Sequence, residues 1–263
     1  MVRSETFSVH QYIGDPVDHV RRLVEWDVDE LIVLDIGNGA MSFEHHRQDY
    51  RNEPVRTLQD FIRRIAVECR IPLTFGGRIR SCDDIRERIY NGADKVSVNA
   101  MLELAPEAVR EACKRFGSQA IVASVDFRRS GKAAHACAGH GQRSLGVTVV
   151  DWCKRAEQLG AGEVLLNAIE RDGTAQGFDV DVAAQVAQSV SVPVIICGGA
   201  GHERHFAACL DETPVSAVAA GNIFHFTENA YPRIKAYLAA RRDDVRPISR
   251  SKRTAPNGRR VRR

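Results

Sequence analysis

The chain has 263 residues, of which 44% are hydrophobic, and a formal net charge of +3. A chain of this size can bury one large core, and α/β barrels of this length are usually single domains. Because no apolar run approaches the roughly 20 residues of a membrane span, and the first residues lack the apolar centre of a signal peptide, we expect a cytoplasmic protein.

The positive charge is concentrated at the end of the chain. The last fourteen residues, from Arg250, hold seven Lys or Arg and no acid, so the rest of the chain is acidic on balance. A terminal run of this composition is typical of a solvated, disordered tail, and we assign it no nucleic-acid partner. We therefore expect a folded domain over residues 1–245 and a basic tail over 246–263.

Helical and strand patterns alternate along the chain. Asp15 and Pro16 predict the start of a helix, and the apolar residues between 58 and 65 follow helical spacing. Short apolar runs predict seven strands, at residues 31–36, 72–75, 95–99, 120–127, 163–169, 193–197 and 216–220. Such strands, separated by helices, are typical of a parallel sheet buried on both faces. The sequence predicts an α/β fold, a TIM barrel with its active site at the carboxyl ends of the strands and one strand short of eight.

A glycine-rich loop pattern occurs twice. IPLTFGGRIRS (71–81) precedes ADKVSVNAML (93–102), and VPVIICGGAG (192–201) precedes VSAVAAGNIF (215–224). In each copy a glycine stands five residues after the proline, as Gly77 after Pro72 and Gly198 after Pro193. Backbone N–H groups at such turns and at helix starts bind anions, so the repeat predicts a ligand with two phosphates.

The two copies are unequal, because the second keeps an open glycine cradle and the first does not. The candidate phosphate-binding residues are Gly198, Gly199, Gly221 and Asn222 in the second copy and Gly77, Arg78, Asn99 and Ala100 in the first. Arg78 stands where the second copy has Gly199, and it either pairs with a phosphate or fills its place. The sequence leaves both readings open, and the second copy is the safer prediction for a phosphate site.

The cysteines and histidines predict no metal site. The seven cysteines are scattered, with no C-x-x-C pair, as expected of reduced thiols. His202, His205 and Cys209 have helical spacing, which favours a helix face over a set of metal ligands. We expect neither a metal nor a cofactor.

Five segments in order resemble the cyclase subunit of imidazole glycerol phosphate synthase, over residues 12–245. They are GGRIRS, ADKVSVN, FGSQAIVASVDF, LLNAIERDGTAQGFD and AAGNIFHF. The resemblance implies a TIM barrel that receives ammonia from a separate glutaminase subunit, as a heterodimer. It also implies a bis-phosphorylated ribotide as substrate, converted in histidine biosynthesis to imidazole glycerol phosphate and an aminoimidazole carboxamide ribotide.

The resemblance assigns roles to individual residues. Asp126 matches a general acid and base at the end of the fifth strand, and Asp35 matches a position near the substrate. Asp172, Gly173 and Thr174 match a loop that brings backbone donors and a hydroxyl toward the substrate. Glu30, Lys95 and Glu163 match a charged gate for ammonia at the opposite end of the barrel, and Asp94 matches a glutaminase contact.

The chain departs from the family pattern in several places. The family's first strand, with a second catalytic aspartate and a gate arginine, has no match here; Met1 falls after it, and Arg3 takes the place of a substrate-binding lysine. Seven parallel strands would leave two open edges, which indicates either an upstream start codon or a degenerate product. Ala100 and Gly221 replace hydroxyl residues at the phosphates, and GNGAMSFEHHRQDYRN (37–52) replaces a shorter loop.

Three alternative functions stay open. The stretch YIGDPVDHVRRLVEWDVDELIVLDI (12–36) is similar to a paralogous branch that supplies ammonia for acetamidino modification of a surface-polysaccharide sugar. A second alternative is a barrel without catalytic activity that only binds the glutaminase. The sister isomerase barrel of the histidine pathway shares the doubled loop, but it would not need the Glu30, Lys95 and Glu163 set.

Overall fold

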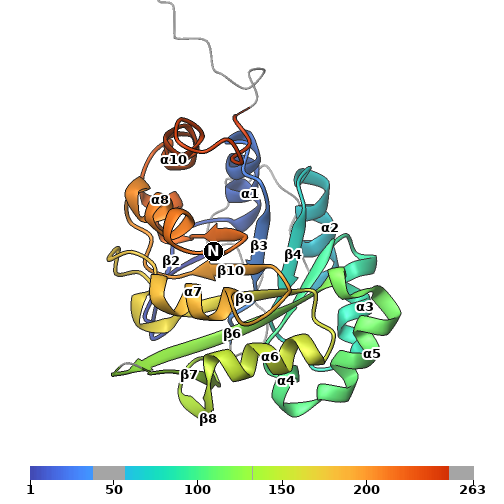
Figure 1. Cartoon of the computed structure of the whole chain (residues 1–263). Coiled ribbons are helices and arrows are strands. Elements are labelled where there is room, and N and C mark those ends of the chain that lie inside the picture. The colour runs from blue at the N-terminus through green and yellow to red at the C-terminus, as the bar shows by residue number, and fades with distance from the viewer. Residues whose placement is uncertain (38–56, 132, 249–263) are drawn as a thin grey trace, which may run out of the picture.

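The computed structural model describes residues 1–37, 57–131 and 133–248. Figure 1 shows a curled sheet with helices packed on its outer side. Seven strands form the parallel part of this sheet, in the order β11-β10-β9-β6-β5-β4-β3. They are β3 (Leu31–Leu34), β4 (Leu73–Gly76), β5 (Lys95–Val98), β6 (Ile121–Ser130), β9 (Glu163–Ala168), β10 (Val194–Cys197) and β11 (Ala217–Ala219).

Each predicted strand is present, and the fold is the α/β barrel type that the sequence predicts. Within the described residues, β3 and β11 are the two ends of the strand order and neither has a second neighbour in the sheet. The side chain of Leu34 on β3 is consequently 40% exposed. The open edges are therefore present as the sequence analysis expects.

The helices between the strands begin where local capping favours them. They are α1 (Pro16–Glu25), α2 (Leu58–Glu68), α3 (Cys82–Tyr90), α4 (Met101–Leu104), α5 (Pro106–Phe116), α6 (Val149–Gln158), α7 (Val180–Ala187), α8 (Glu203–Glu212), α9 (Asn222–Phe226) and α10 (Ala230–Ala239). The Asp15 carboxylate accepts hydrogen bonds from the first backbone N–H groups of α1, as predicted. Ile62 and Ile65 of α2 are fully buried, which is the apolar stripe expected from their spacing.

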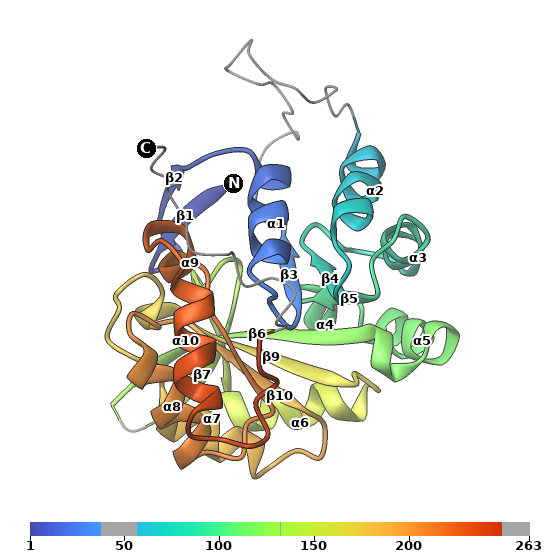
Figure 2. The same ribbon diagram turned by 90° about the horizontal axis from the view of Figure 1, so that it is seen from above.

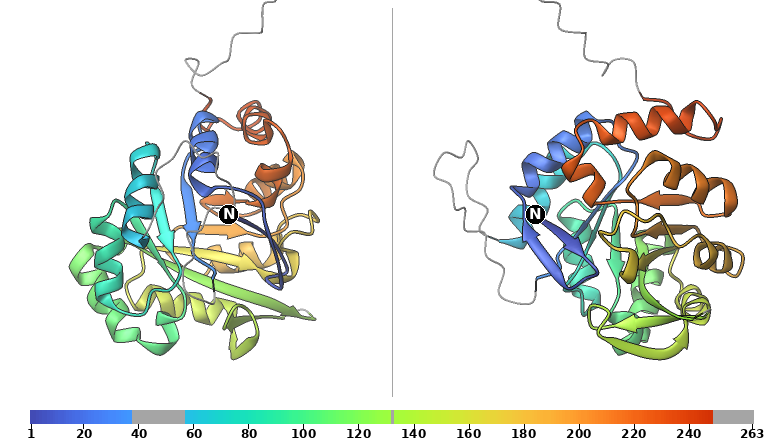
Figure 3. Two further views of the ribbon diagram at one scale, coloured as in Figure 1. Left: turned by 180° about the vertical axis from the view of Figure 1, so that it is seen from behind. Right: turned by 90° about the vertical axis from the view of Figure 1, so that its left-hand side faces the viewer.

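Two antiparallel hairpins were not predicted. β1 (Val2–Glu5) pairs with β2 (Val9–Tyr12) in a separate sheet at one end of the molecule, beside α1 (Figure 2). β7 (Ala133–Ala138) and β8 (Arg143–Thr148) extend the carboxyl end of β6. Their sequences are rich in small and polar residues, so neither shows the apolar run or alternation on which strand prediction depends. Both hairpins lie next to the ends of the parallel strands (Figure 3).

The inward face of the barrel strands carries a charged layer, an apolar layer and a polar layer in turn. Glu163, Leu165 and Asn167 alternate along β9, and Leu165 packs with Val122 and Ile195 of neighbouring strands inside the barrel. Side chains two residues apart on a strand share a face. Charged residues at the start of the strands and polar residues at their ends are therefore separated by an apolar layer.

The carboxyl end of the described chain packs against the first half. Arg246 Nη1 lies 2.9 Å from Asp27 Oδ2, and its Nε lies 2.9 Å from Asp29 Oδ1. The ordered body therefore extends at least to Arg246, which the sequence analysis placed in the tail; residues 249–263 of that tail lie outside the described residues. None of the helices in the described ranges combines the length and apolar character needed to cross a membrane.

Candidate functional site

A buried carboxylate lies at the carboxyl ends of the central strands. Asp126 on β6 is 7% exposed. Its Oδ1 accepts a hydrogen bond from Asn167 Nδ2 at 2.9 Å, and its Oδ2 accepts one from Asn99 Nδ2 at 3.0 Å. Burial raises the pKa of Asp126, although the two amide donors and His140 favour its ionised form. A carboxyl group with a raised pKa, fixed by two amides, is suited to accept and return a proton.

Asn167 was not predicted as a site residue. It lies opposite Asp126 in the parallel register of β6 and β9, and its Nδ2 also donates to Ser124 Oγ at 3.0 Å. The only sequence signal was a single polar residue inside the apolar run EVLLNAI. Asn99 was predicted to bind phosphate, but its amide points to Asp126 in this structure.

The opposite ends of the same strands carry a charged cluster. Lys95 Nζ lies 2.5 Å from Glu163 Oε1 and 3.2 Å from Glu30 Oε2. Burial disfavours the charge on Lys95, but the two carboxylates outweigh burial and raise its pKa. The structure therefore brings together the three residues predicted to converge there. Asp94 lies at the same end, where its Oδ2 accepts a hydrogen bond from the backbone N–H of Leu73 at 2.8 Å.

The second glycine loop has the open backbone expected of it. Gly198 and Gly199 have φ values of 104° and 99°, which favour glycine. The carbonyl oxygen of Gly177 lies 2.1 Å from where a Cβ on Gly199 would be, so no side chain fits there. Gly221 forms the N-cap of α9 without a side-chain cap.

The N-terminal hairpin binds the loop that contains Asp172, Gly173 and Thr174. Ser4 Oγ donates a hydrogen bond to Asp172 Oδ2 at 2.6 Å, and Asn222 Nδ2 donates to the carbonyl oxygen of Ser4 at 2.6 Å. A Cβ on Gly173 would lie 2.6 Å from that same carbonyl oxygen, so the approach requires glycine. Thr174 Oγ1 donates to the carbonyl of Arg171 at 2.8 Å, which uses the hydroxyl within the turn rather than presenting it to a ligand.

The first glycine loop has the same backbone form and a different side chain. Gly77 and Arg78 have φ values of 92° and 53°. Arg78 Nε lies 2.8 Å from Asp35 Oδ2, with the two side chains 30% and 13% exposed. Ala100 forms the N-cap of α4 and offers no side-chain cap, as expected from the lost hydroxyl.

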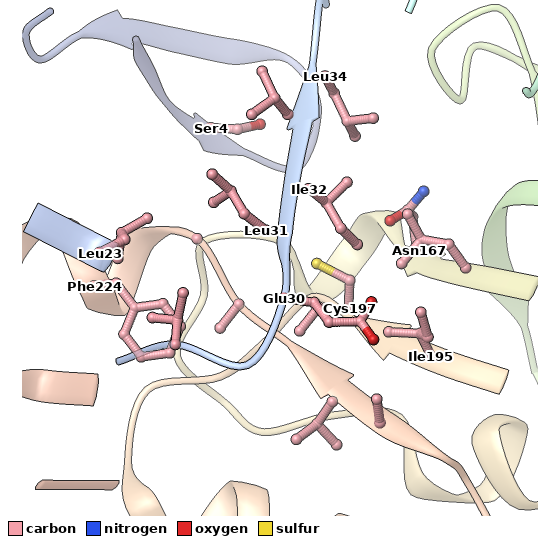
Figure 4. A pocket seen from close by; sticks show the side chains of 18 of the residues that line it. Ser4, Leu23, Glu30, Leu31, Ile32, Leu34, Asn167, Ile195, Cys197 and Phe224 are labelled. Carbon is pink, nitrogen blue, oxygen red and sulfur yellow. The ribbon is translucent and has the colours of Figure 1, made fainter. Parts of the chain in front are cut away.

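One cavity of about 1530 Å³ connects both ends of the barrel. Its walls include Arg78, Asn167 and Gly221 near the carboxyl ends of the strands and Glu30 and Glu163 near the other end. Figure 4 shows Asn167, Cys197 and Ile195 facing Ile32 and Leu34 of β3 across this space. The cavity also runs along the open side between β3 and β11, which accounts for its size.

Other sequence-based candidates contribute less to this site. His202 caps α8 by accepting a hydrogen bond from Arg204 N, and Cys209 is buried. Among the described residues, no group of three His, Cys, Asp or Glu side chains is arranged to hold a metal. The segment 38–52, expected near the substrate, lies outside the described residues, and the backbone of Arg3 belongs to β1.

Residues 1–230 match the family model described as "Histidine biosynthesis protein". The chain belongs to this family. It is 38% identical over 252 residues to the imidazole glycerol phosphate synthase subunit HisF of Thermobifida fusca (strain YX), an alignment that covers 94% of this chain and 93% of that relative. The family resemblance drawn from the five sequence segments is thereby confirmed.

Proposed function

We propose that this protein is the cyclase subunit of an imidazole glycerol phosphate synthase. It uses ammonia to cleave and close a bis-phosphorylated ribotide, with formation of imidazole glycerol phosphate and an aminoimidazole carboxamide ribotide. The observation that carries the proposal is the placement of Asp126, buried between Asn99 and Asn167 at one end of the barrel interior, with the Lys95 cluster at the other end.

The proposed path of ammonia between the two ends of the barrel runs along the strands. Lys95 begins β5 and Asn99 directly follows its last residue, so the two are four residues apart, or about 13 Å of extended chain. Ser97 lies between them on the same face, is 3% exposed, and its Oγ has no hydrogen-bond partner among the described residues. The layer between the two ends is lined by apolar side chains, Val122, Leu165 and Ile195, which admit neutral ammonia more readily than ammonium because an unpaired charge is costly to desolvate.

The carboxylate of Asp126 performs the proton transfers. Its raised pKa brings the acid and base forms closer to neutral pH, and the two amides hold both oxygens in place during the exchange. The two glycine loops bind the phosphates at the two ends of the substrate, on either side of Asp126. The loop that contains Asp172 lies beside Asn222, next to the second glycine loop.

The partner is a glutaminase subunit that docks at the end of the barrel where the strands begin. Glu30, Lys95 and Glu163 form the entrance there, and Asp94 lies beside them. Glutamine hydrolysis in the partner would deliver ammonia at this entrance. A cytoplasmic heterodimer fits this arrangement.

To test this proposal, the purified protein is incubated with the bis-phosphorylated ribotide in two assays. One assay contains ammonium salt, and the other contains glutamine and the glutaminase. We expect cyclisation in both assays, loss of both in Asp126→Asn, and full activity in Asp83→Asn, whose side chain is 74% exposed on α3. No turnover in the ammonium assay would refute the proposal. Stimulated glutamine hydrolysis without cyclisation would identify the chain as a binding partner only.

A further inference from the structure

The first glycine loop contains an arginine in a backbone conformation that favours glycine. Arg78 has a φ of 53°, and its counterpart in the second loop is Gly199, with a φ of 99°. A residue with a side chain is disfavoured in this left-handed region. The chain therefore tolerates local strain to place a guanidinium at this point, and only in one of the two loops.

Asp35 and Gly37 lie next to the Arg78 side chain. Asp35 Oδ2 lies 2.8 Å from Arg78 Nε, and Asp35 Oδ1 accepts a hydrogen bond from the backbone N–H of Gly37 at 3.0 Å. A Cβ on Gly37 would lie 2.6 Å from Arg78 Nη2, so glycine leaves room for the guanidinium. Asp35 is fixed by a backbone donor and in turn orients Arg78.

The terminal nitrogens of Arg78 remain available to a ligand. Within the described residues, no acceptor forms a hydrogen bond with Nη1 or Nη2, and the side chain lines the same cavity as Asn167 and Gly221. A guanidinium that pairs electrostatically with a carboxylate on its Nε side keeps its Nη1 and Nη2 donors, which match the oxygens of a phosphate.

The other residues of the first loop offer no equivalent donor. Ala100 has no hydroxyl, and the amide of Asn99 is used by Asp126. Arg78 is thus the one charged side chain at this loop that is oriented toward the cavity among the described residues.

We propose that Arg78, positioned by Asp35, is the phosphate-binding side chain of the first loop and replaces the missing glycine and hydroxyl. This proposal rests on the proposed function in taking a substrate with a phosphate at each end. The two ends of the substrate are then recognised differently: one by backbone N–H groups, the other by a guanidinium with a fixed counter-ion.

The first experiment uses inorganic phosphate, which tests the two phosphate sites without the rest of the substrate. Isothermal titration at low ionic strength should give two phosphates bound by the natural protein and one by Arg78→Gly. Arg78→Lys keeps the positive charge but loses the two parallel N–H donors of the guanidinium. We expect this variant to bind the phosphate at the first loop roughly tenfold more weakly. Arg80→Ala serves as the matched control, because Arg80 is exposed in the same loop and does not line the cavity.

The second experiment measures KM and kcat with the ribotide and ammonium. Arg78→Gly should raise KM roughly ten- to hundredfold, the loss expected for charge-assisted hydrogen bonds, with a smaller change in kcat. Asp35→Asn should raise KM in the same direction. Thermal unfolding midpoints of all variants show whether each is folded.

The outcomes separate the two proposals. A natural protein that binds fewer than two phosphates, or an Arg78→Gly variant that binds phosphate or ribotide as well or better, overturns the role of Arg78. The latter result would mean that the arginine fills the phosphate position. Phosphate stoichiometry falling from two to one without any ribotide turnover would support Arg78 and refute the proposed reaction.

Discussion

Replacement of Lys95 by methionine tests the charged cluster at the barrel entrance. The Lys95 and Glu163 side chains are each only 17% exposed and 2.5 Å apart. Coulomb's law with an effective dielectric constant of about 20 gives roughly 6–7 kcal/mol of attraction at that distance, much of it offset by the desolvation of both ions. Glu30 adds less, because its side chain is 46% exposed.

The variant leaves the Glu163 carboxylate, which is only 17% exposed, without its nearest counter-charge. Breaking a buried pair on one side costs about 3–5 kcal/mol, and Glu163 Oε2 already lacks a hydrogen-bond partner among the described residues. We therefore expect Lys95→Met to lower the free energy of unfolding by about 3 kcal/mol. The double variant Lys95→Met, Glu163→Leu should recover most of that loss, and Lys114→Met on the exposed side of α5 should change it by less than about 0.5 kcal/mol.

The assay is urea denaturation between pH 7 and 8. Because the pKa of Lys95 is raised in the folded state, the contribution of the pair is complete below the lysine's unfolded pKa and is lost as the pH rises from there through the folded pKa, so it is constant between pH 7 and 8. A loss below about 1 kcal/mol in Lys95→Met, or no recovery in the double variant, would refute the reasoning. In activity assays, the glutamine-dependent rate should fall more than the ammonium-dependent rate, because in the proposed function only the former requires ammonia to enter past this cluster.

Three further outcomes are expected. Asn167→Ala removes a donor that favours ionised Asp126, so the pKa of Asp126 rises further and the acid limb of the kcat/KM pH profile should move to higher pH; an unmoved limb would contradict the assignment. Ser4→Ala removes the hydrogen bond to Asp172 and should increase amide hydrogen exchange in β1 and in residues 172–174, with β7 and β8 unchanged. Burial raises the pKa of Cys153 to about 12, so this thiol should react with a disulfide reagent at neutral pH only after unfolding; fast labelling of the native protein at Cys153 would contradict its burial.

The parallel part of the fold was predictable because each strand is a short apolar run between helices. The two hairpins were not, since β1–β2 and β7–β8 consist of small and polar residues whose pairing depends on the surface they pack against. An isolated two-stranded hairpin is marginally stable in water, so its sequence carries a weak signal. Ser4 holds the β1–β2 hairpin in position by hydrogen bonds to Asp172 and Asn222, which are more than 160 residues away in the chain.

The sequence indicated where the charged residues of the site lie, but it did not indicate Asn167 or the contact that the Asn99 amide makes. Asp126 directly follows the apolar run AIVASV (120–125), where a carboxylate is conspicuous, and Lys95 and Glu163 start two strands. Asn167 becomes a candidate only once the register of β6 and β9 places it opposite Asp126. The direction of Asn99 likewise depends on which of two neighbours its amide meets, and spacing along one strand does not determine that.

The two glycine loops illustrate how a repeated backbone can acquire different chemistry. Both copies bend through two successive residues with positive φ, at Gly77 and Arg78 and at Gly198 and Gly199. At Gly199 the carbonyl of Gly177 fills the space of a Cβ, so that loop can only bind through its backbone. Arg78 also has a positive φ, but its side chain is accommodated beside Asp35, with which it forms an ion pair. Backbone N–H groups bind any phosphate of suitable size. A guanidinium whose orientation is fixed by a carboxylate also favours one orientation of the bound phosphate. Under the proposed function, this asymmetry gives the substrate one orientation relative to Asp126, which a symmetric pair of loops would not.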